Sequence, residues 1–266
     1  MIASCHSLIH LLRSLILDSK MSPYAAIQVA KRKHDEVPVC SRTLYNYIYR
    51  FNFPTSPSDL IHGPRRSRRK PVSKRLSRTN LMGSSIDSRP ASINDRSEFG
   101  HHEMDTVVGS AGSKAVLLVL TERVSRFEHI IPMKDKSQKS VRLALNRLKR
   151  HYGARFPLLF KSITCDNGSE FLDSAAICNS CRNSQARTTT LYYAHPYCAS
   201  ERGSNENANR LIRRFLPIGT DFSSFSQRDM DSLAYWMNCY PRKIHDGKAA
   251  FQITRQFTFH SNPLHS

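Results

Sequence analysis

The sequence is poor in acidic residues and contains no run of 18 apolar residues. Its 266 residues include 21 Asp and Glu against 40 Lys and Arg, which gives a formal net charge of +19 and a pI near 10.0. The missing apolar run argues against a transmembrane helix, and the basic residues do not form one amphipathic helix. A polyanionic partner is therefore expected, and nucleic acid is favoured over a membrane surface.

Disulfide and export signals are also missing. The seven cysteines are odd in number and scattered, which argues against a disulfide framework and agrees with a reducing compartment. Residues 1–19 lack a positively charged start and a small-residue cleavage site, so they do not predict a signal peptide. The leucines of this stretch repeat at helical spacing and predict an amphipathic core helix instead. We therefore expect an intracellular protein.

Three short helices are predicted in residues 1–60. The first runs from His6 to about Lys20, Ser22 and Pro23 are suited to start the second, and the third begins at Ser41. The third helix leaves polar side chains at its surface, among them Arg42, Asn46 and Arg50. This pattern is typical of a helix-turn-helix domain whose last helix enters the major groove of DNA. The alternative is a plain three-helix bundle.

A strongly basic segment follows, from Ile61 to Asn80, and it contains no acidic residue. Such a block repels itself and cannot form a core, so residues 61–98 are predicted to be a linker or arm that neutralises DNA phosphates. The alternative is a localisation-like or solubilising patch. The basic residues of the segment are Arg65, Arg66, Arg68, Arg69, Lys70, Lys74, Arg75 and Arg78.

Residues 99–245 are predicted to form an α/β domain. Three apolar segments in quick succession indicate an antiparallel meander, and they are followed by a helix over 137–152, a strand over 161–165 and a short strand over 191–194. The order of strands and helices fits an RNase H-like layer better than a doubly wound sheet. Residues 246–266 are poorly patterned and are expected to form a loosely packed tail.

The stretch from Glu201 to Phe215 is predicted to be a helix with two different faces. One face carries Glu206, Asn209, Arg210 and Arg213, and the opposite face carries Ala208, Leu211, Ile212 and Phe215. The apolar face is wide enough to pack on a core, so Glu206 would be held on a rigid element. Asn205 is the expected N-cap residue.

Three carboxylates indicate a metal-dependent reaction. Asp105 lies within the first predicted strand, Asp166 follows the fourth, and Glu206 lies on the helix. Carboxylates at the ends of neighbouring strands cost free energy unless a cation is bound, and Mg²⁺ or Mn²⁺ suits hard oxygen ligands. Two such ions, about 3.5–4 Å apart, activate water or a 3′-hydroxyl for displacement at a phosphodiester. The expected chemistry is phosphoryl transfer on DNA.

These residues also resemble those of bacterial insertion-sequence transposases of the DDE class, closest to the insertion-sequence-thirty family. The matching pieces spread over about residues 40–245 and are GHHEMDTVVG around Asp105, TCDNGSEF around Asp166, ERGSNENANRLIRRFLPIGTDF around Glu206, and NCYPRK. The resemblance implies an integrase-like catalytic core with Asp105, Asp166 and Glu206 as the metal-binding triad. It places Arg213 where related enzymes carry a DNA-contacting basic residue.

The resemblance also implies recognition of terminal inverted repeats by the N-terminal part and a homo-oligomer that pairs two DNA ends in the bacterial cytoplasm, at the nucleoid. Family members usually carry a longer N-terminal region with an additional helix-turn-helix, so a truncated copy is expected. His102 takes the place of the family's Trp, so packing there should differ. The alternatives are a truncated DNA-binding protein that represses transposition without catalysis, and a simple RNase H-like nuclease.

Other polar residues are weaker candidates. Cys178 and Cys181 form a CxxC that His195 and Cys198 could complete as a zinc site, but the spacing lacks a second tight knuckle. Of the aromatic residues before the helix, Tyr192, Tyr193 and Tyr197 are candidates for stacking on a base, and core packing accounts equally well for the first two. His101 and His102 are expected to be solvated, and Glu103 and Glu170 to have surface or salt-bridge roles.

Overall fold

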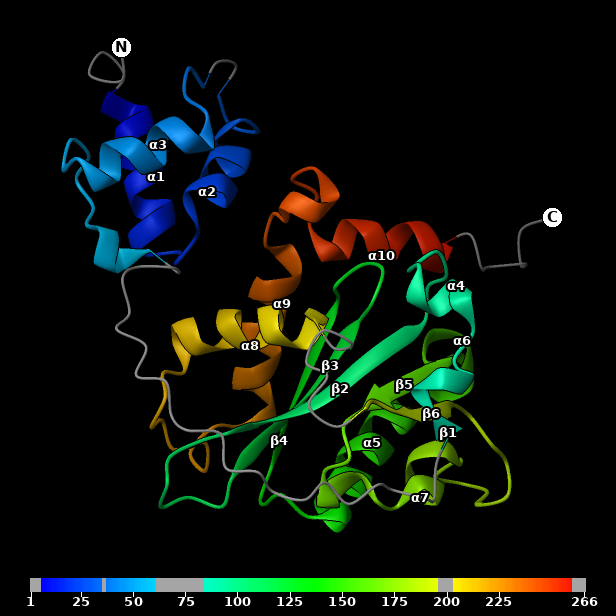
Figure 1. Ribbon diagram of the computed structural model, residues 1–266. Coiled ribbons are helices and arrows are strands. Elements are labelled where there is room, and N and C mark those ends of the chain that lie inside the picture. Colours follow the sequence, from blue (N-terminus) through cyan, green and yellow to red (C-terminus); the bar gives the residue numbers. More distant parts are fainter. Residues whose placement is uncertain (1–5, 35–36, 61–83, 196–202, 260–266) are drawn as a thin grey trace. The chain divides into compact units, whose positions relative to one another are not determined.

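The computed structural model of the chain describes residues 6–34, 37–60, 84–195 and 203–259. The chain divides into two compact units, one made of residues 1–73 and 239–253 and the other of residues 74–238 and 254–266 (Figure 1). Of the predicted arm of residues 61–98, residues 61–83 lie outside the described residues, and they include Arg65, Arg66, Arg68, Arg69 and Lys70. Residues 84–98 contain a short strand, β1 (Ser84–Ser85), and a short helix, α4 (Ala91–Asn94), so this part is not an open linker. Within the described ranges, no helix is both long and apolar enough to cross a membrane.

The first unit contains the three predicted helices, α1 (His6–Leu17), α2 (Pro23–Ala30) and α3 (Ser41–Tyr49). Ser22 caps α2 as expected, because its hydroxyl accepts a hydrogen bond from the Ala25 amide at 3.2 Å. The buried apolar residues of the three helices form one small core, which includes Leu8, Leu12, Ile16, Ala26, Ile27, Leu44 and Ile48.

The C-terminal segment is more ordered than the predicted tail. Residues 239–253 belong to the first unit, where the Tyr240 hydroxyl accepts a hydrogen bond from the Ser22 amide at 3.0 Å. Helix α10 (Ala250–Phe259) lies within the expected tail of residues 246–266, so that expectation is wrong. The small side chains of residues 249–250 are buried, and their size gives no hydrophobic period for a sequence pattern to reveal.

The second unit is built on a six-stranded sheet in the order β1-β6-β5-β2-β3-β4. The central β2 pairs antiparallel with β3, and β3 with β4, which is the predicted meander. On the other side of β2, strands β5, β6 and β1 run parallel to it. This order is the RNase H-like α/β arrangement expected from the sequence. The strands are β1 (Ser84–Ser85), β2 (His101–Val108), β3 (Val116–Glu122), β4 (Glu128–Met133), β5 (Ser162–Cys165) and β6 (Thr190–Tyr193).

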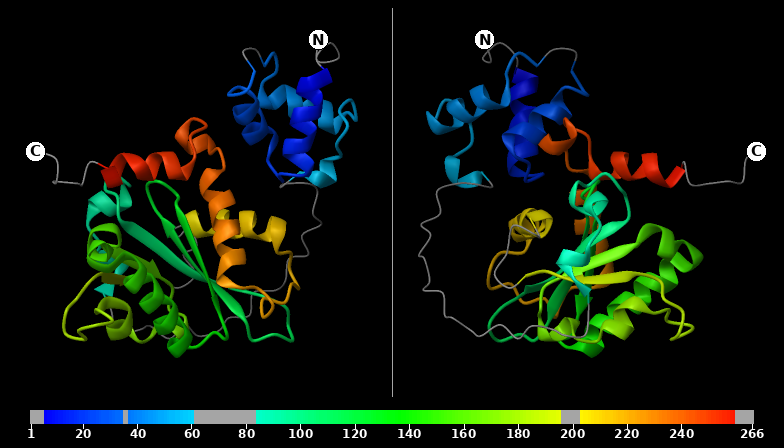
Figure 2. Two further views of the ribbon diagram at one scale, coloured as in Figure 1. Left: turned by 180° about the vertical axis from the view of Figure 1, so that it is seen from behind. Right: turned by 45° about the vertical axis from the view of Figure 1, so that its right-hand side comes forward.

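Helices cover both faces of this sheet. Figure 2 shows α5 (Gln138–Tyr152) and α8 (Gly203–Phe215) on opposite faces. Helix α9 (Gln227–Cys239) lies along the edge strand β4, where the Asn238 side chain bonds to both the amide and the carbonyl of Glu128. These bonds satisfy backbone groups that an edge strand would otherwise expose. Three short helices complete the described part of the unit: α4 (Ala91–Asn94), α6 (Phe156–Leu159) and α7 (Ser174–Cys178).

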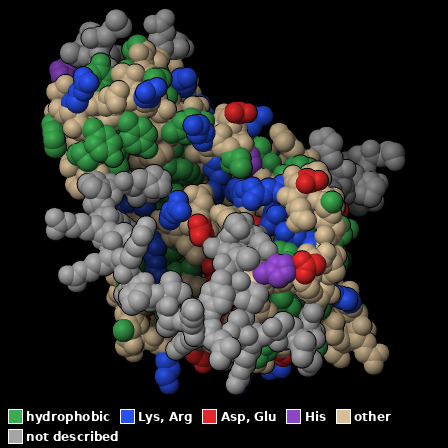
Figure 3. All heavy atoms as spheres, viewed as in Figure 1, with side chains coloured by type: hydrophobic (Ala, Val, Ile, Leu, Met, Phe, Trp, Pro, Cys, Tyr) green, Lys and Arg blue, Asp and Glu red, His purple; other side chains and the backbone are tan. Residues whose placement is uncertain are grey.

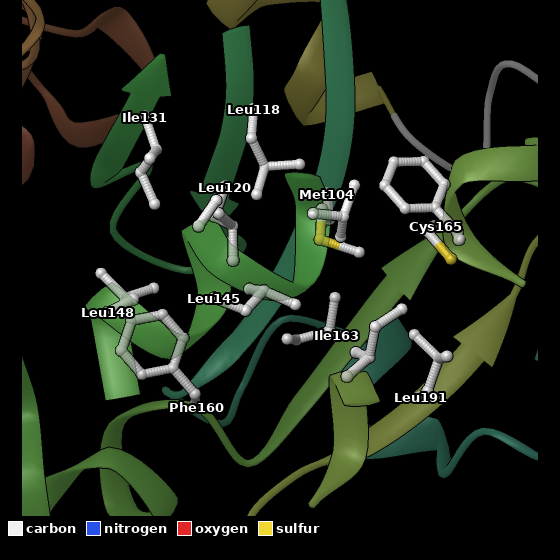
Figure 4. Packing of buried hydrophobic residues seen from close by; sticks show 14 of the residues in the cluster. Met104, Leu118, Leu120, Ile131, Leu145, Leu148, Phe160, Ile163, Cys165 and Leu191 are labelled. Carbon is white, nitrogen blue, oxygen red and sulfur yellow. The ribbon is translucent and has the colours of Figure 1, made fainter. Parts of the chain in front are cut away.

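The main core lies between the sheet and α5. Met104 of β2 points into it together with Leu118 of β3 and Leu145 of α5 (Figure 4). Because side chains alternate along a strand, Glu103 and Asp105 point to the opposite face of β2, where α8 packs. The face of the sheet toward α5 therefore forms the hydrophobic core, and the opposite face carries the carboxylates that lie near α8.

Candidate active site

Asp105 and Asp166 lie on neighbouring strands. The parallel register pairs Glu103 of β2 with Thr164 of β5, and Asp105 and Asp166 each follow two residues later along the chain. Both side chains are half-buried. The Oδ2 of Asp105 accepts a hydrogen bond from Asn209 Nδ2 at 3.1 Å, and the Oδ1 of Asp166 accepts one from the Gly168 amide at 3.0 Å. Asp105 therefore lies within β2, Asp166 directly follows β5, the strand that pairs with β2, and each carboxylate is oriented by one of these hydrogen bonds.

Helix α8 packs on this face with the predicted apolar residues. Ala208, Leu211 and Ile212 are buried, as the sequence pattern indicates. The helix begins at Gly203, so Asn205 lies inside its first turn and is buried. The expectation that Asn205 is the N-cap is therefore wrong. A cap cannot be located from sequence when two or more residues near the helix start are equally suited to it.

Glu206 does not lie with the two aspartates. Its side chain is 57% exposed, and Arg210, one turn further along α8, forms an ion pair with it at 3.5 Å. Among the residues that the structure describes, no three His, Cys, Asp or Glu side chains form a cluster suited to a metal ion. The structure thus places Asp105 on β2, Asp166 after the adjacent strand β5 and Glu206 on α8, and the metal-binding triad stays a prediction.

Two further helix residues contact the strand rather than solvent alone. Asn209 reaches Asp105, as described above, and Arg213 Nη2 donates to the Val108 carbonyl at 2.6 Å. The Arg213 guanidinium also lies over the Phe222 ring, 5.8 Å from its centroid. Burial lowers the pKa of Arg213 from its ordinary value. These contacts tie the C-terminal half of α8 to the end of β2.

A second carboxylate lies beside Asp166. Glu170 is 3% exposed, and its Oε1 accepts from Thr106 Oγ1 at 2.9 Å and pairs with Lys136 Nζ at 3.1 Å. Its Oε2 has no hydrogen-bond partner among the described residues. A Cβ atom on Gly168 would lie 2.6 Å from that oxygen and 2.9 Å from Asp166 Oδ1. Only glycine therefore fits between the two carboxylates.

The donor set suits a divalent cation. Asp105 supplies hard carboxylate oxygens on β2, Asp166 supplies them directly after the neighbouring β5, and Glu170, whose Oε2 has no partner among the described residues, lies near Asp166. Mg²⁺ and Mn²⁺ prefer such oxygen ligands, whereas zinc prefers nitrogen and sulfur. The residues present therefore fit the metal implied by the sequence, with Glu206 still paired to Arg210.

Little in the sequence indicated that Glu103 would be buried. It is fully buried, and it forms the predicted kind of salt bridge, with Arg123 Nη1 at 2.5 Å. Desolvation lowers the pKa of Arg123, and the carboxylate of Glu103 opposes that shift. Glu103 also binds the first turn of α8. The only sequence signal was its position two residues before Asp105, on the same face of a strand.

The remaining candidates have structural surroundings. His101 and His102 are buried rather than solvated, and the His102 ring stacks on Phe160 at 4.2 Å. His195 binds Asp87 at 3.1 Å. Tyr192 and Tyr193 are buried in β6, as core packing requires. Tyr197 and Cys198 lie outside the described residues, so the zinc and base-stacking predictions that include them stay predictions.

In the first unit, the predicted DNA-contacting residues of α3 are exposed. Arg42, Asn46 and Arg50 follow one another at intervals of four and are all exposed, while Leu44 and Ile48 face the core. Figure 3 shows Lys and Arg side chains on both units in the view of Figure 1. Residues at this interval lie on one face of a helix, so Arg42, Asn46 and Arg50 have the spacing of one exposed face.

Comparison with known proteins identifies the family. No family model matches the chain. The transposase for insertion sequence element IS1086 from Cupriavidus metallidurans is 32% identical over 247 residues, which cover 90% of this chain and 70% of that protein. The chain belongs to the insertion-sequence transposase family. The match confirms the resemblance of the chain to insertion-sequence transposases.

Two further members of the transposase family are similar. The probable transposase for IS1161 from Streptococcus salivarius is 35% identical over 83% of this chain, and the InsI transposase for IS30A from Escherichia coli is 31% identical over 69% of it. The chain spans 61% and 44% of the lengths of these two transposases. A solved structure, the catalytic core domain of BIV integrase, is 19% identical with a TM-score of 0.42 and covers 62% of this chain and 100% of that domain.

Proposed function

We propose that this chain cleaves DNA at the terminal inverted repeats of an insertion sequence and joins the cut end to target DNA, with Asp105, Asp166 and Glu206 as its catalytic acids. The observation that carries the proposal is the position of Asp105 on β2 and of Asp166 directly after the paired strand β5, in a chain of the transposase family. A protein that only bound DNA would have no use for two half-buried carboxylates on neighbouring segments of the sheet.

Asp105 and Asp166 would hold Mg²⁺ or Mn²⁺ as two ions, with Glu206 completing the ligand set. When bound, the metal supplies activation of water or a 3′-hydroxyl and stabilisation of the leaving oxygen. Glu206 must first leave its ion pair with Arg210, which is inexpensive because exposed pairs contribute about 0.2–1 kcal/mol. The helix itself needs no unfolding for that change of rotamer.

The chain's own groups orient the acids and bind the substrate. The Asn209 amide fixes Asp105 and the Gly168 N–H fixes Asp166, so that neither carboxylate needs to reorganise during the reaction. Once Glu206 has moved, Arg210 is available for a DNA phosphate. Arg213 is held between Val108 and the Phe222 ring, and from there it adds positive charge beside the site.

DNA recognition would use the first unit. Arg42, Asn46 and Arg50 form the exposed stripe of α3 that suits the major groove, and the basic arm would neutralise phosphates. A transposition reaction joins two element ends to one target, so we also propose a homo-oligomer assembled on DNA. The setting would be the bacterial cytoplasm, where the nucleoid supplies both substrates.

A second candidate is a DNA-binding protein that occupies element ends without catalysis. The observation that favours it is the exposure of Glu206 and its pairing with Arg210, away from the two aspartates. The two candidates differ in one readout, because both bind DNA and only the first breaks and joins phosphodiester bonds.

The test is strand transfer of labelled element-end DNA in Mg²⁺ by the intact chain and by Glu206→Gln. The proposal predicts nicked and joined products from the intact chain, loss of both from Glu206→Gln, and equal DNA binding by the two proteins. Binding by the intact chain without any nicking or joining would refute the catalytic proposal and support the second candidate.

A further inference from the structure

We propose that Glu103 is a positioning residue that holds the first turn of α8 against β2 and thereby sets the place of Glu206 relative to Asp105. The part of this inference that concerns Glu206 rests on the proposed function. The part that concerns the helix stands on contacts alone.

Glu103 uses both carboxylate oxygens to bind the start of α8. Its Oε2 accepts hydrogen bonds from the backbone amides of Ser204 at 3.0 Å and Asn205 at 3.3 Å. Its Oε1 accepts from the Ser204 hydroxyl at 2.9 Å and from Arg123 Nη1 at 2.5 Å. The first amides of a helix have no partners within the helix, so this carboxylate satisfies groups that burial would otherwise leave unpaired.

Charge makes this contact stronger than a neutral one. The N-terminal end of a helix carries partial positive charge, and the Arg123 guanidinium supplies a full one on the other side of the carboxylate. A fully buried carboxylate is stable only with partners of this kind. The Asn205 side-chain amide has no partner within the described ranges, so the attachment of this turn depends on Glu103 and Ser204.

Residues of the turn between β3 and β4 also contact the Glu103–Ser204 pair at the start of α8. Arg123 Nε also donates to the Ile93 carbonyl at 3.2 Å, and Arg126 Nη1 donates to the Ser204 hydroxyl. Ser204 thus lies between Glu103 and Arg126. The start of α8 is therefore bound to β2 and to the turn that follows β3, both of which are rigid parts of the sheet.

A second contact between α8 and β2 adds to the effect of the Glu103 contact on the position of Glu206. Asn209 binds Asp105, two residues after Glu103 on the same face of β2. Two strand residues span about 6.7 Å, and the five helix residues from Ser204 to Asn209 span about 7.5 Å. The helix therefore runs alongside β2 in the same direction, fixed at two points, and Glu206 lies between them. Without the Glu103 contact, the first turn of α8 would lose its attachment to β2, while Asn209, Arg213 and the apolar face would still hold the rest of the helix.

The test compares Glu103→Gln with Glu122→Gln in the full-length chain. Glu122 is a matched control because it is also buried in the sheet and accepts from two backbone amides and a serine hydroxyl, yet these belong to Gly100 and Ser125 and not to α8. Ser204→Ala, which removes the hydroxyl contacts with Glu103 and Arg126 but keeps the backbone amides, is the milder second variant if Glu103→Gln folds poorly. The readouts are amide hydrogen exchange over residues 204–209 and Mn²⁺ affinity measured by electron paramagnetic resonance.

We expect Glu103→Gln to speed exchange of the first-turn amides by about tenfold and to weaken Mn²⁺ binding by about tenfold, with a smaller shift of the same sign in Ser204→Ala. Glu122→Gln should change neither, even where it lowers Tm as much. Equal exchange rates of the first-turn amides in Glu103→Gln and Glu122→Gln would contradict the proposal that Glu103 holds α8. Faster exchange in Glu103→Gln with unchanged Mn²⁺ affinity would contradict its role in positioning Glu206. If the intact chain binds no Mn²⁺ and joins no DNA, the proposed function fails, and the exchange comparison alone decides whether Glu103 holds α8.

Discussion

The two faces of the six-stranded sheet are built from alternate residues of the same strands and differ in chemistry. Toward α5, Met104 and Leu118 join a fully buried apolar cluster. Toward α8, Glu103 and Asp105 meet amides, a hydroxyl and a guanidinium. One residue along the strand changes the chemistry completely. Substitutions on the α5 face should therefore change stability most, and substitutions on the α8 face should change DNA cleavage and joining most.

The largest effect on folding is expected on the α5 face. Replacing Leu118 by Ala removes a fully buried side chain and leaves a cavity, so the free energy of unfolding should fall by about 3 kcal/mol. Chemical denaturation measures this loss in the free energy of unfolding. Leu143→Ala on α5, at a side chain 49% exposed, is the control and should cost far less. Equal losses from the two variants would contradict the assignment of the core.

The strand-end carboxylates provide the next comparison. Gly168→Ala would push a Cβ into Glu170 and Asp166, so we expect a loss of about 1–3 kcal/mol in the free energy of unfolding together with a large loss of DNA joining. Gly112→Ala is the matched control, since nothing lies within 4 Å of its Cβ position. Normal joining by Gly168→Ala would show that this spacing does not matter for the reaction.

The α5 face also carries histidines that burial keeps neutral. Burial lowers the pKa of His129 to about 4, so this side chain binds its proton more weakly in the folded chain than in the unfolded chain. Its contribution is complete above about pH 6.5 and is lost as the pH falls toward 4. From pH 7.5 to 5, the free energy of unfolding should drop by about 1–2 kcal/mol more in the intact chain than in His129→Phe.

Denaturation at the two pH values measures this difference. His151→Gln is a second variant, because the charge of His151, an exposed residue of α5, helps to lower the pKa of His129, so its loss should reduce the pH dependence slightly. A pH dependence that is the same in His129→Phe as in the intact chain would remove His129 from the explanation.

The smallest effect is expected on the exposed flank of α8. Arg210→Ala should change the free energy of unfolding by less than about 0.5 kcal/mol, because both side chains of its ion pair are mostly exposed. Mn²⁺ affinity should rise slightly, since Glu206 no longer has a competing partner. Arg228→Ala, at another exposed position, is the control. Weaker Mn²⁺ binding in Arg210→Ala would mean that the pair orients Glu206 rather than withholding it.

The local elements could be predicted because local patterns determine them. Ser22 and Pro23 start α2 as expected, Ser137 caps α5, and the apolar period of α8 places Ala208, Leu211 and Ile212 in the interior. The meander of β2, β3 and β4 followed from three apolar runs with short connections. In each case the deciding residues are neighbours in the sequence.

Contacts between distant residues could not be predicted in this way. Nothing in the sequence near Glu103 indicates that Arg123 and Ser204 will bury its charge, and β-strand period alone gives Glu103 and Asp105 the same surroundings. The exposure of Glu206 likewise depends on how far α8 is rotated, which its two attachments to β2 decide. Helix α10 was missed because Ala249 and Ala250 pack through small size and not through a hydrophobic stripe.

The most direct test of the central claim is DNA joining by Asp166→Asn beside Asp231→Asn, an exposed aspartate on α9. The account predicts that the intact chain and Asp231→Asn join labelled element ends in Mg²⁺. Asp166→Asn should bind the same DNA and melt at a similar temperature, but join it about a thousandfold more slowly, a difference of about 4 kcal/mol in activation free energy. Joining by Asp166→Asn at the rate of the intact chain would contradict the account.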